Sequence, residues 1–541
     1  MNRTTLSLLA AATALAAVTG FAALTAPDAG QPDTQAQAGT PSRLPVERSS
    51  LLCPAPGTSD IAETTYTSFT PAGGGTAGAA ADPAAESSAE LKPSVGTLAD
   101  ASPVKPEEKP AKDDEKKDGT EEGDAAKDEK AKKPAPRTPD KPLLTLKEPG
   151  KPVAAEESGS DTPALVGTAS GRLAPGWTTQ QTTTVSAGSG RGVLGVSCTA
   201  PDTDFWFPGA SLAKDRQDYV HLTNPDDDTV ATVDIELYGK DGLLKSKQEP
   251  GGIKVKPGAT TRVLIPYLAA EPAEDVTVHV TTREGRVGAV VRAAGDATGS
   301  DWLPASTDPS GQLVMPGIPA DATSVRLVAF APGEADADLK IRLATASGTI
   351  TPAGAESLRV KSGMTAFADL KDVTKGEAGS LLLSPSQSGK ATPVVAALQV
   401  TRGKGDKQEV AFIPATAPVS GRATAADNRA KGSVLSLAAP GAAAEVKVTA
   451  SAGTEGGTQV VKTYTIKAGT TLAITPPVPA GLKGSYALTV EPQPGGGPVH
   501  AARTLLLPQD GIEMFTVQTL PDDRGMVAVP TAEQDLTVLG D

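Results

Sequence analysis

A short pattern returns along this chain at an almost constant interval, and that interval constrains the fold more than any other feature. Three clear copies read Lys-x-Gly-x-Thr directly after a strand-like run, and their glycines, Gly258, Gly363 and Gly469, are 105 and 106 residues apart. A weaker copy places a glycine at Gly176. The interval is the length of one small β-sandwich domain. The sequence therefore predicts a tandem array of similar modules.

Each repeat contains about seven short runs of strand-forming residues, separated by Gly, Pro, Asn or Asp, with almost no helical periodicity. Runs of this kind are typical of a Greek-key sandwich. We expect an all-β chain of tandem immunoglobulin-like β-sandwich modules. The repeated glycine should form a tight turn with positive φ, and the threonine should begin the next strand.

The matching runs also predict the domain boundaries. The first module is roughly 60 residues longer than the others, and its surplus is rich in proline and mixed charge, which favours a disordered insertion. The predicted segments are an export segment at 1–28, a flexible tether at 29–44, a first module at 45–210 with its insertion at about 72–161, and further modules at 211–310, 311–417 and 418–541, the last with a C-terminal tail.

The N-terminus has the pattern of a targeting segment. Arg3 precedes an apolar run from Leu6 to Ala26, and Pro27 follows a small-x-small cleavage pattern directly. A cleaved export signal fits the pattern. A single uncleaved membrane helix also fits, because about 20 apolar residues span a bilayer. Either alternative places the modules outside the cytoplasm, secreted or anchored to the outer face of the cytoplasmic membrane.

The two cysteines of the chain are Cys53 and Cys198, both in the first module. An even number of cysteines in an exported chain is most simply explained by a disulfide. We expect this bond to join an opening strand of the module to a closing one, across a single core.

Residues that could carry catalysis or hold a metal are sparse. The chain has three histidines in separate strand-like runs, and it lacks the common nucleophile-elbow, zinc-helix, phosphate-loop and dinucleotide motifs. The acidic run Asp226–Asp228 follows a turn and is better explained as loop charge than as a calcium site. We therefore expect no enzymatic activity, no cofactor and no metal.

The net charge of the chain limits the classes of partner that it can bind. A formal net charge of −14 argues against nucleic acid, which needs a basic surface, and against simple adhesion to anionic lipid. Contact with a membrane is expected only through the N-terminal segment, if it is uncleaved.

Several stretches resemble one protein family. These are the Ala-rich export segment, the stretch Arg48–Gly57, the pair Ser197–Cys198 and the phrase Phe205–Gly209. Together they resemble an actinobacterial family of exported proteins that carries only a domain-of-unknown-function label. The resemblance implies an envelope-associated protein without an established activity, so it assigns no catalytic or binding residue.

The hypothesis that follows is a non-enzymatic extracytoplasmic scaffold, spacer or interaction protein of the cell envelope, with an envelope protein or glycan as its unidentified partner. The alternative is a carbohydrate-binding accessory protein for envelope-polymer synthesis or turnover, because aromatic side chains on sandwiches can stack on sugars. Trp206 and Trp302 stand at matching places in two repeats by sequence, which favours packing over ligand contact.

Overall fold

The computed structural model describes residues 42–57, 59–73, 87–94, 99–100, 141–188, 190–248, 250–387 and 391–529. These residues form β-strands connected by turns, with three short 3-10 helices among them: η1 (Gly171–Leu173), η2 (Ile265–Tyr267) and η3 (Gly405–Lys407). The predicted all-β sandwich fold is confirmed. The predicted export segment, the tether up to residue 41 and the tail beyond residue 529 lie outside the described residues.

Residues 44–527 form one compact unit, and residues 1–43 with 528–541 form another. The described residues of the second unit belong to β1 (Ser42–Pro45) and β39 (Met526–Val529), which pair as a two-stranded sheet.

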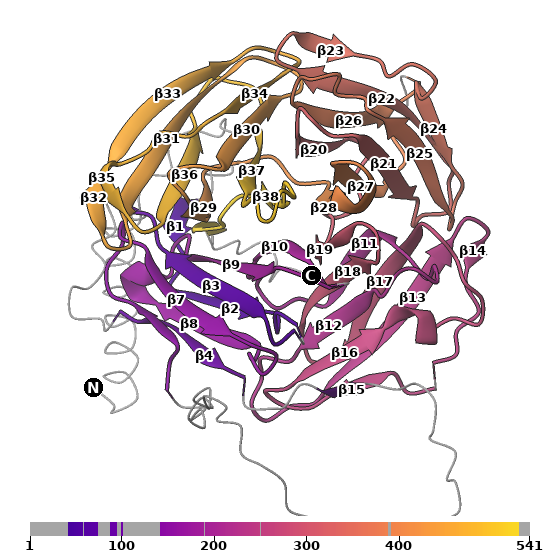
Figure 1. The fold of residues 1–541 in the computed structure, drawn as a ribbon, viewed down its shortest axis with the longest axis horizontal. Coiled ribbons are helices and arrows are strands. Elements are labelled where there is room, and N and C mark those ends of the chain that lie inside the picture. Colours follow the sequence, from indigo (N-terminus) through magenta and orange to yellow (C-terminus); the bar gives the residue numbers. More distant parts are fainter. Residues whose placement is uncertain are drawn as a thin grey trace, which may run out of the picture. The chain divides into compact units, whose positions relative to one another are not determined.

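The first two sandwiches each consist of two sheets (Figure 1). The first sandwich has one sheet of order β2 (Arg48–Cys53), β8 (Leu165–Ser170), β4 (Ala89–Pro93), β6 (Leu144–Leu146), and a second of order β10 (Gly192–Ser197), β9 (Thr178–Val185), β3 (Ala62–Phe69), β7 (Val153–Ser158). The second sandwich has one sheet of order β11 (Asp204–Ala210), β17 (Val276–Glu284), β13 (Ala231–Gly239), β14 (Gly242–Leu243), with β15 (Ile253–Val255) also on β13, and a second of order β19 (Gly299–Leu303), β18 (Gly288–Gly295), β12 (Tyr219–Thr223), β16 (Thr260–Leu264), β5 (Ala99–Asp100).

The third and fourth sandwiches repeat this plan. The third has one sheet of order β20 (Leu313–Ile318), β26 (Gly379–Pro385), β22 (Ala337–Thr345), β23 (Gly348–Ile350), with β24 (Ser357–Val360) on β22, and a second of order β25 (Thr365–Lys371), β21 (Ser324–Phe330), β27 (Val395–Arg402), β28 (Glu409–Pro414). The fourth has one sheet of order β29 (Ala423–Asn428), β36 (Tyr486–Pro492), β31 (Ala444–Gly453), β32 (Gly456–Thr458), β35 (Ala480–Lys483), with β33 (Val460–Ile466) on β31, and a second of order β34 (Thr470–Ile474), β30 (Ser433–Ala439), β37 (His500–Leu506), β38 (Phe515–Leu520).

Strand β22 illustrates why these sequences form half-buried strands. Leu339, Ile341 and Leu343 are buried in the sandwich, whereas Lys340 and Arg342 between them are exposed. Side chains of a strand alternate between its two faces, so this sequence buries its apolar residues only when it is extended.

The repeated glycine marks the place where the chain crosses, in each repeat, from one sheet of the sandwich to the other. Gly258, Gly363 and Gly469 have φ values of 60°, 67° and 69°, and each follows β15, β24 or β33. The backbone N–H of each glycine donates to a carbonyl at the end of the strand that opens the opposite sheet or just beyond it, at Asp226, Ala331 or Ala439. The pattern therefore repeats because the crossover repeats.

In the first sandwich this turn contains Gly150 and not Gly176. Gly150 has φ 85°, lies between β6 and β7, and donates its N–H to the carbonyl of Thr70 at 2.7 Å. Gly176 has φ 73° but lies between η1 and β9. The sequence pattern missed Gly150 because Glu148 replaces the lysine and Pro152 replaces the threonine of the other copies.

The strand pairing also differs from two assignments made from the sequence. β11 pairs with β17, so residues 204–210 belong to the second sandwich although the predicted boundary follows residue 210. β2 takes the place in the first sandwich that β11 and β20 take in the next two, and β3 takes the place of β12 and β21. The Pro/Gly turn after each of these strands made β2 resemble β12 by sequence.

The predicted insertion at 72–161 is too wide. Strands β4, β6 and β7 lie within it and complete the sheets of the first sandwich. The backbone of β5 pairs in parallel with β16 of the second sandwich. These strands are short or carry charged residues on their exposed side, so they gave little hydrophobic alternation. The predicted disorder of residues 74–86, 95–98 and 101–140 falls outside the described residues.

Each sandwich has a largely separate aliphatic core, but the cores meet at the junctions. The cluster inside the third sandwich includes Ala502, Phe515 and Val517 of the fourth. The cluster inside the second includes Val410 and Phe412 of the third. The expectation of a self-contained interior in every module is therefore incomplete, because apolar side chains of one module also fill the edge of its neighbour.

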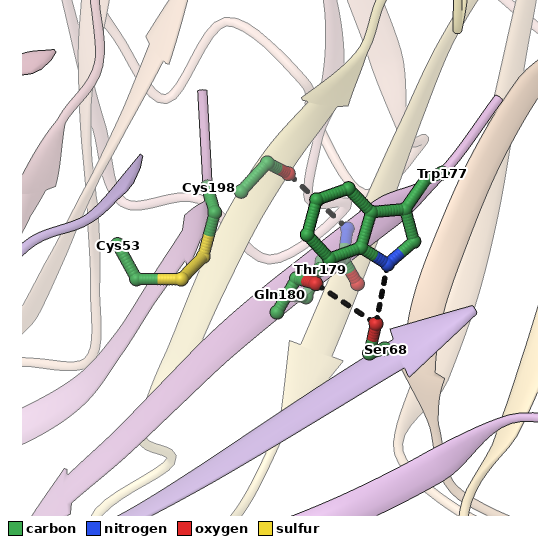
Figure 2. The surroundings of a disulfide bond; sticks show 7 residues. Cys53, Ser68, Trp177, Thr179, Gln180 and Cys198 are labelled. Atoms are coloured by element: carbon green, nitrogen blue, oxygen red, sulfur yellow. Dashed lines mark hydrogen bonds between the residues drawn. A yellow bond between two sulfur atoms is a disulfide. The ribbon is translucent and has the colours of Figure 1, made fainter. Parts of the chain in front are cut away.

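The disulfide between Cys53 and Cys198 is confirmed (Figure 2). Cys53 ends β2 and Cys198 follows β10, so the bond joins the two sheets of the first sandwich. Both residues are buried in a cluster with Trp177. The indole Nε1 of Trp177 donates to Ser68 Oγ at 2.8 Å, and the Thr179 hydroxyl donates to the same oxygen at 3.1 Å.

Replacing both cysteines with serine should lower the free energy of unfolding of the first sandwich by about 2–5 kcal/mol, because the bond closes a long loop in the unfolded chain. Urea unfolding followed by circular dichroism measures the loss, and the wild-type chain in reductant should unfold like the variant. An unchanged urea midpoint would contradict a stabilising role for the bond.

The Gly363→Ala variant should lose about 1–2 kcal/mol of stability, because a Cβ at φ 67° is strained although it would meet no atom within 4 Å. The matched control is Gly333→Ala, whose Cβ also meets nothing within 4 Å and whose φ is not positive. Equal stability of the two variants in thermal unfolding would show that the turn tolerates a side chain.

Candidate functional site

The closing strands of the sandwiches, β10, β19, β28 and β38, meet one another in the compact unit (Figure 1). Each is the edge strand of its sheet. β10 contacts β19, β19 contacts β28, β28 contacts β38, and β38 contacts β10. We call this region the closing-strand junction. It is the candidate functional site because it gathers buried charged groups from all four sandwiches.

Asp301 on β19 connects three sandwiches. Its carboxylate accepts the backbone N–H of Gly195 on β10 at 3.1 Å and the hydroxyl of Thr516 on β38 at 3.0 Å. It also accepts the N–H of Trp302 at 2.8 Å. The residue is 1% exposed, and this burial raises its pKa well above the ordinary value.

Glu409 on β28 forms an ion pair with Arg191, which precedes β10. Arg191 Nε lies 2.7 Å from Glu409 Oε1, and Arg191 Nη2 donates to the Gln408 carbonyl at 2.7 Å. Among the described residues, Glu409 Oε2 has no hydrogen-bond partner. Burial therefore outweighs the arginine and raises the pKa of Glu409 to about 7.

Arg503 on β37 connects the fourth sandwich to the first. Its guanidinium is fully buried and donates to Gln180 Oε1 at 2.9 Å and to Gln518. The same Gln180 oxygen accepts the backbone N–H of Ala426 at 2.9 Å. Burial lowers the pKa of Arg503 to about 10, while the nearby Asp427 opposes this change.

Glycines allow the closing strands to approach. A Cβ at Gly195 would lie 2.5 Å from Thr516 Cγ2, and one at Gly299 would lie 2.7 Å from the carbonyl oxygen of Arg191. Real Cβ atoms do not come this close, so larger residues would push β10 away from β38 and from β19. The junction thus depends on small residues as much as on charged ones.

The three histidines take separate structural positions. His221 packs edge-on against Trp302, and His279 stacks on Trp206 with ring centroids 3.6 Å apart. His500 Nδ1 lies 3.0 Å from the Thr416 carbonyl oxygen, and burial lowers its pKa to about 4. Within the described part of the chain, no group of three His, Cys, Asp or Glu residues is arranged to hold a metal ion.

The residues singled out from sequence lie mostly outside the junction. Cys198 directly follows β10, whereas Gly258 and Gly363 lie at the sheet crossovers. The carbonyl of Gly469 accepts the Thr349 hydroxyl at 2.6 Å, so this turn also joins the third and fourth sandwiches. Gly176 lies beside Arg422 of the fourth sandwich, whose Nη2 donates to the adjacent Pro175 carbonyl.

Sequence reasoning missed the charged residues of the junction. The usable signal was a single charged residue inside or beside an apolar strand, as at Asp301, Glu409 and Arg503. Charged residues are rarely buried unless they have partners, so such an interruption indicates a partner from elsewhere in the chain.

A family model matches residues 153–477, from the start of β7 to the segment after β34. The chain belongs to DUF5719, a family of unknown function. The DUF5719 match covers Arg191, Asp301 and Glu409 but ends before Arg503. The resemblance to a family of this kind is confirmed at that level. No curated protein matches the chain. Among the described residues, none forms a helix long and apolar enough to cross a membrane.

The Glu409→Gln variant should lose the part of the pH dependence that Glu409 causes. Because folding raises the pKa of this acid from 4.5 to about 7, the folded chain holds a proton that the unfolded chain releases. The wild type should therefore lose up to about 3 kcal/mol, relative to the variant, as the pH rises from 4 to 8.

Urea unfolding of both proteins at several pH values measures this difference. The control is Glu445→Gln, which removes an exposed carboxylate from β31. A difference between wild type and E409Q that stays constant from pH 4 to 8 would show that Glu409 does not hold the proton.

Proposed function

We propose that this chain is a non-enzymatic interaction scaffold of the cell envelope, acting outside the cytoplasm. The observation that carries the proposal is the closing-strand junction, in which buried groups connect all four sandwiches. A protein that presents surfaces from several modules to a partner gains affinity when those modules are fixed in advance, since less ordering entropy is lost on binding.

The buried charges support fixed module positions more than high stability. Bringing Asp301, Glu409 and Arg503 out of water costs free energy that their partners only partly return. Their contacts, however, form only when the sandwiches adopt one arrangement. Such a junction suits a platform for partners better than an extended spacer, because contacts of the fourth sandwich return to the first.

The proposed location rests on two features. The apolar N-terminal run after Arg3 has the pattern of an export signal or anchor. The buried disulfide is compatible with an oxidising compartment outside the cytoplasm. The actinobacterial envelope is part of the same proposal and follows from the sequence resemblance.

The carbohydrate-binding alternative has less support from the aromatic residues. Trp177 and Trp302 are buried, with exposed fractions of 4% and 1%. Trp206 is partly buried between His279 and Phe330. It lies on β11 and Trp302 lies on β19, so the two do not occupy equivalent positions as their sequence neighbours suggested.

Cross-linking on intact cells that make the full chain, followed by affinity purification, tests the scaffold. We expect one or more envelope proteins or polymers to co-purify reproducibly with the full chain. The control lacks residues 1–28 and should lose these partners, because it should remain inside the cell. An exported, folded chain that recovers nothing beyond the mock sample would contradict the proposal, and turnover of an envelope polymer by the purified chain would contradict its non-enzymatic part.

A further inference from the structure

A cavity of about 290 Å³ lies where the first sandwich meets the second. Its lining includes Tyr219, His221, Arg262 and Arg292 from the second sandwich, with Gly188 and Gly190 from the first. No aspartate or glutamate is among the described residues that line it. The charged side chains among these lining residues are therefore basic, although the chain as a whole carries a net charge of −14.

Strand register explains why these side chains share one wall. Tyr219 and His221 are two residues apart on β12, so they point to the same face. Arg292 on β18 lies opposite Tyr219, and Arg262 on β16 lies opposite His221. The two arginines lie on the strands that flank β12 on either side, and these strands are about 10 Å apart. Both side chains line the cavity.

Among the residues that line this cavity, Arg292 is the one that points to a ligand. Its Nε is buried and has no hydrogen-bond partner among the described residues. Its guanidinium lies beside two glycines of the first sandwich, since a Cβ at Gly57 would be 3.3 Å from Nη1 and one at Gly190 would be 2.8 Å from Nη2. Burial, and then repulsion by Arg262, lowers the pKa of Arg292.

Arg262 has a partner already, because its guanidinium carbon lies 5.5 Å from the centre of the Tyr219 ring. What points to a ligand is therefore Arg292, with Arg262 and Tyr219 shaping the wall beside it.

We propose that this cavity binds a small oxyanion, a phosphate or a carboxylate group carried by a ligand of about monosaccharide size. A guanidinium presents N–H donors in a planar fork that fits two oxygens of such a group. The anion would give Arg292 the partner it lacks and would relieve the repulsion between the two arginines. The volume lies just below the usual range for ligand pockets, which begins at about 300 Å³, so the ligand is small.

The oxyanion site goes beyond the scaffold function and does not depend on it. A ligand that bridges β12 and the loop before β10 would also hold the first two sandwiches together. The net negative charge of the chain repels anions at long range, so binding must come from contacts inside the cavity. The affinity should therefore not depend only on the negative charge of the ligand.

Isothermal titration of the full purified chain with inorganic phosphate and with glucuronate, at constant ionic strength, tests the proposal. We expect at least one probe to bind with one site per chain, and glucose, the neutral control, not to bind. Binding of phosphate alone identifies a phosphoryl ligand, binding of glucuronate alone identifies a sugar acid, and binding of both identifies the shared oxyanion chemistry. Absence of binding by both probes overturns the proposal.

Two variants locate the site. Arg292→Gln should weaken binding at least tenfold, whereas Arg342→Gln, which removes an exposed arginine from β22, should bind like the wild type. Equal affinity of the two variants overturns the proposal. If circular dichroism shows that R292Q does not fold, Gly190→Ala decides, because its Cβ should displace only the end of the Arg292 side chain. Wild-type affinity of G190A would then contradict the site.

Discussion

The edge strand of a β-sandwich carries backbone N–H and C=O groups that need partners, and the whole unit depends on how four such edges meet. Polar side chains of one sandwich complete the edges of another. Asp301 of the second accepts the N–H of Gly195 in the first, and Gln180 of the first accepts the N–H groups of Ala426 and Asp427 in the fourth. Hydrogen bonds across these edges thus join the repeated modules into one compact unit. Exposed edge strands would otherwise promote aggregation.

The buried charges lower the stability that the junction could have, but they define how the sandwiches are placed relative to one another. An apolar junction would bury similar area without desolvating Asp301, Glu409 or Arg503, but apolar surfaces tolerate sliding. A buried carboxylate or guanidinium keeps its partners only in one register, because a small shift removes them. The aliphatic cores provide most of the stabilisation inside each sandwich, and the charged groups determine how the sandwiches are placed.

The sequence predicted what is local and repeated: the sandwich class, three of the four crossover glycines and the disulfide. It misplaced what differs between copies, such as Gly150, whose neighbours had lost the repeated lysine and threonine. The closing-strand junction could not be predicted from the sequence, and the reason is physical. Arg191 and Glu409 are 218 residues apart, so no local periodicity reports their contact. A lone charge in an apolar strand indicates that a partner exists without identifying it.

The contact between β10 and β38 also sets the order in which the molecule can be completed. Gln180 on β9 and Arg503 on β37 are 323 residues apart, so the first sandwich gains its full set of contacts only when the end of the chain has been made. During synthesis or export, the contacts of β10 with the second sandwich can form first, whereas its contacts with β38 form only after the third and fourth sandwiches are made. The Cys53–Cys198 bond can close as soon as residue 198 emerges, and it then holds the two sheets of the earliest sandwich together through that delay.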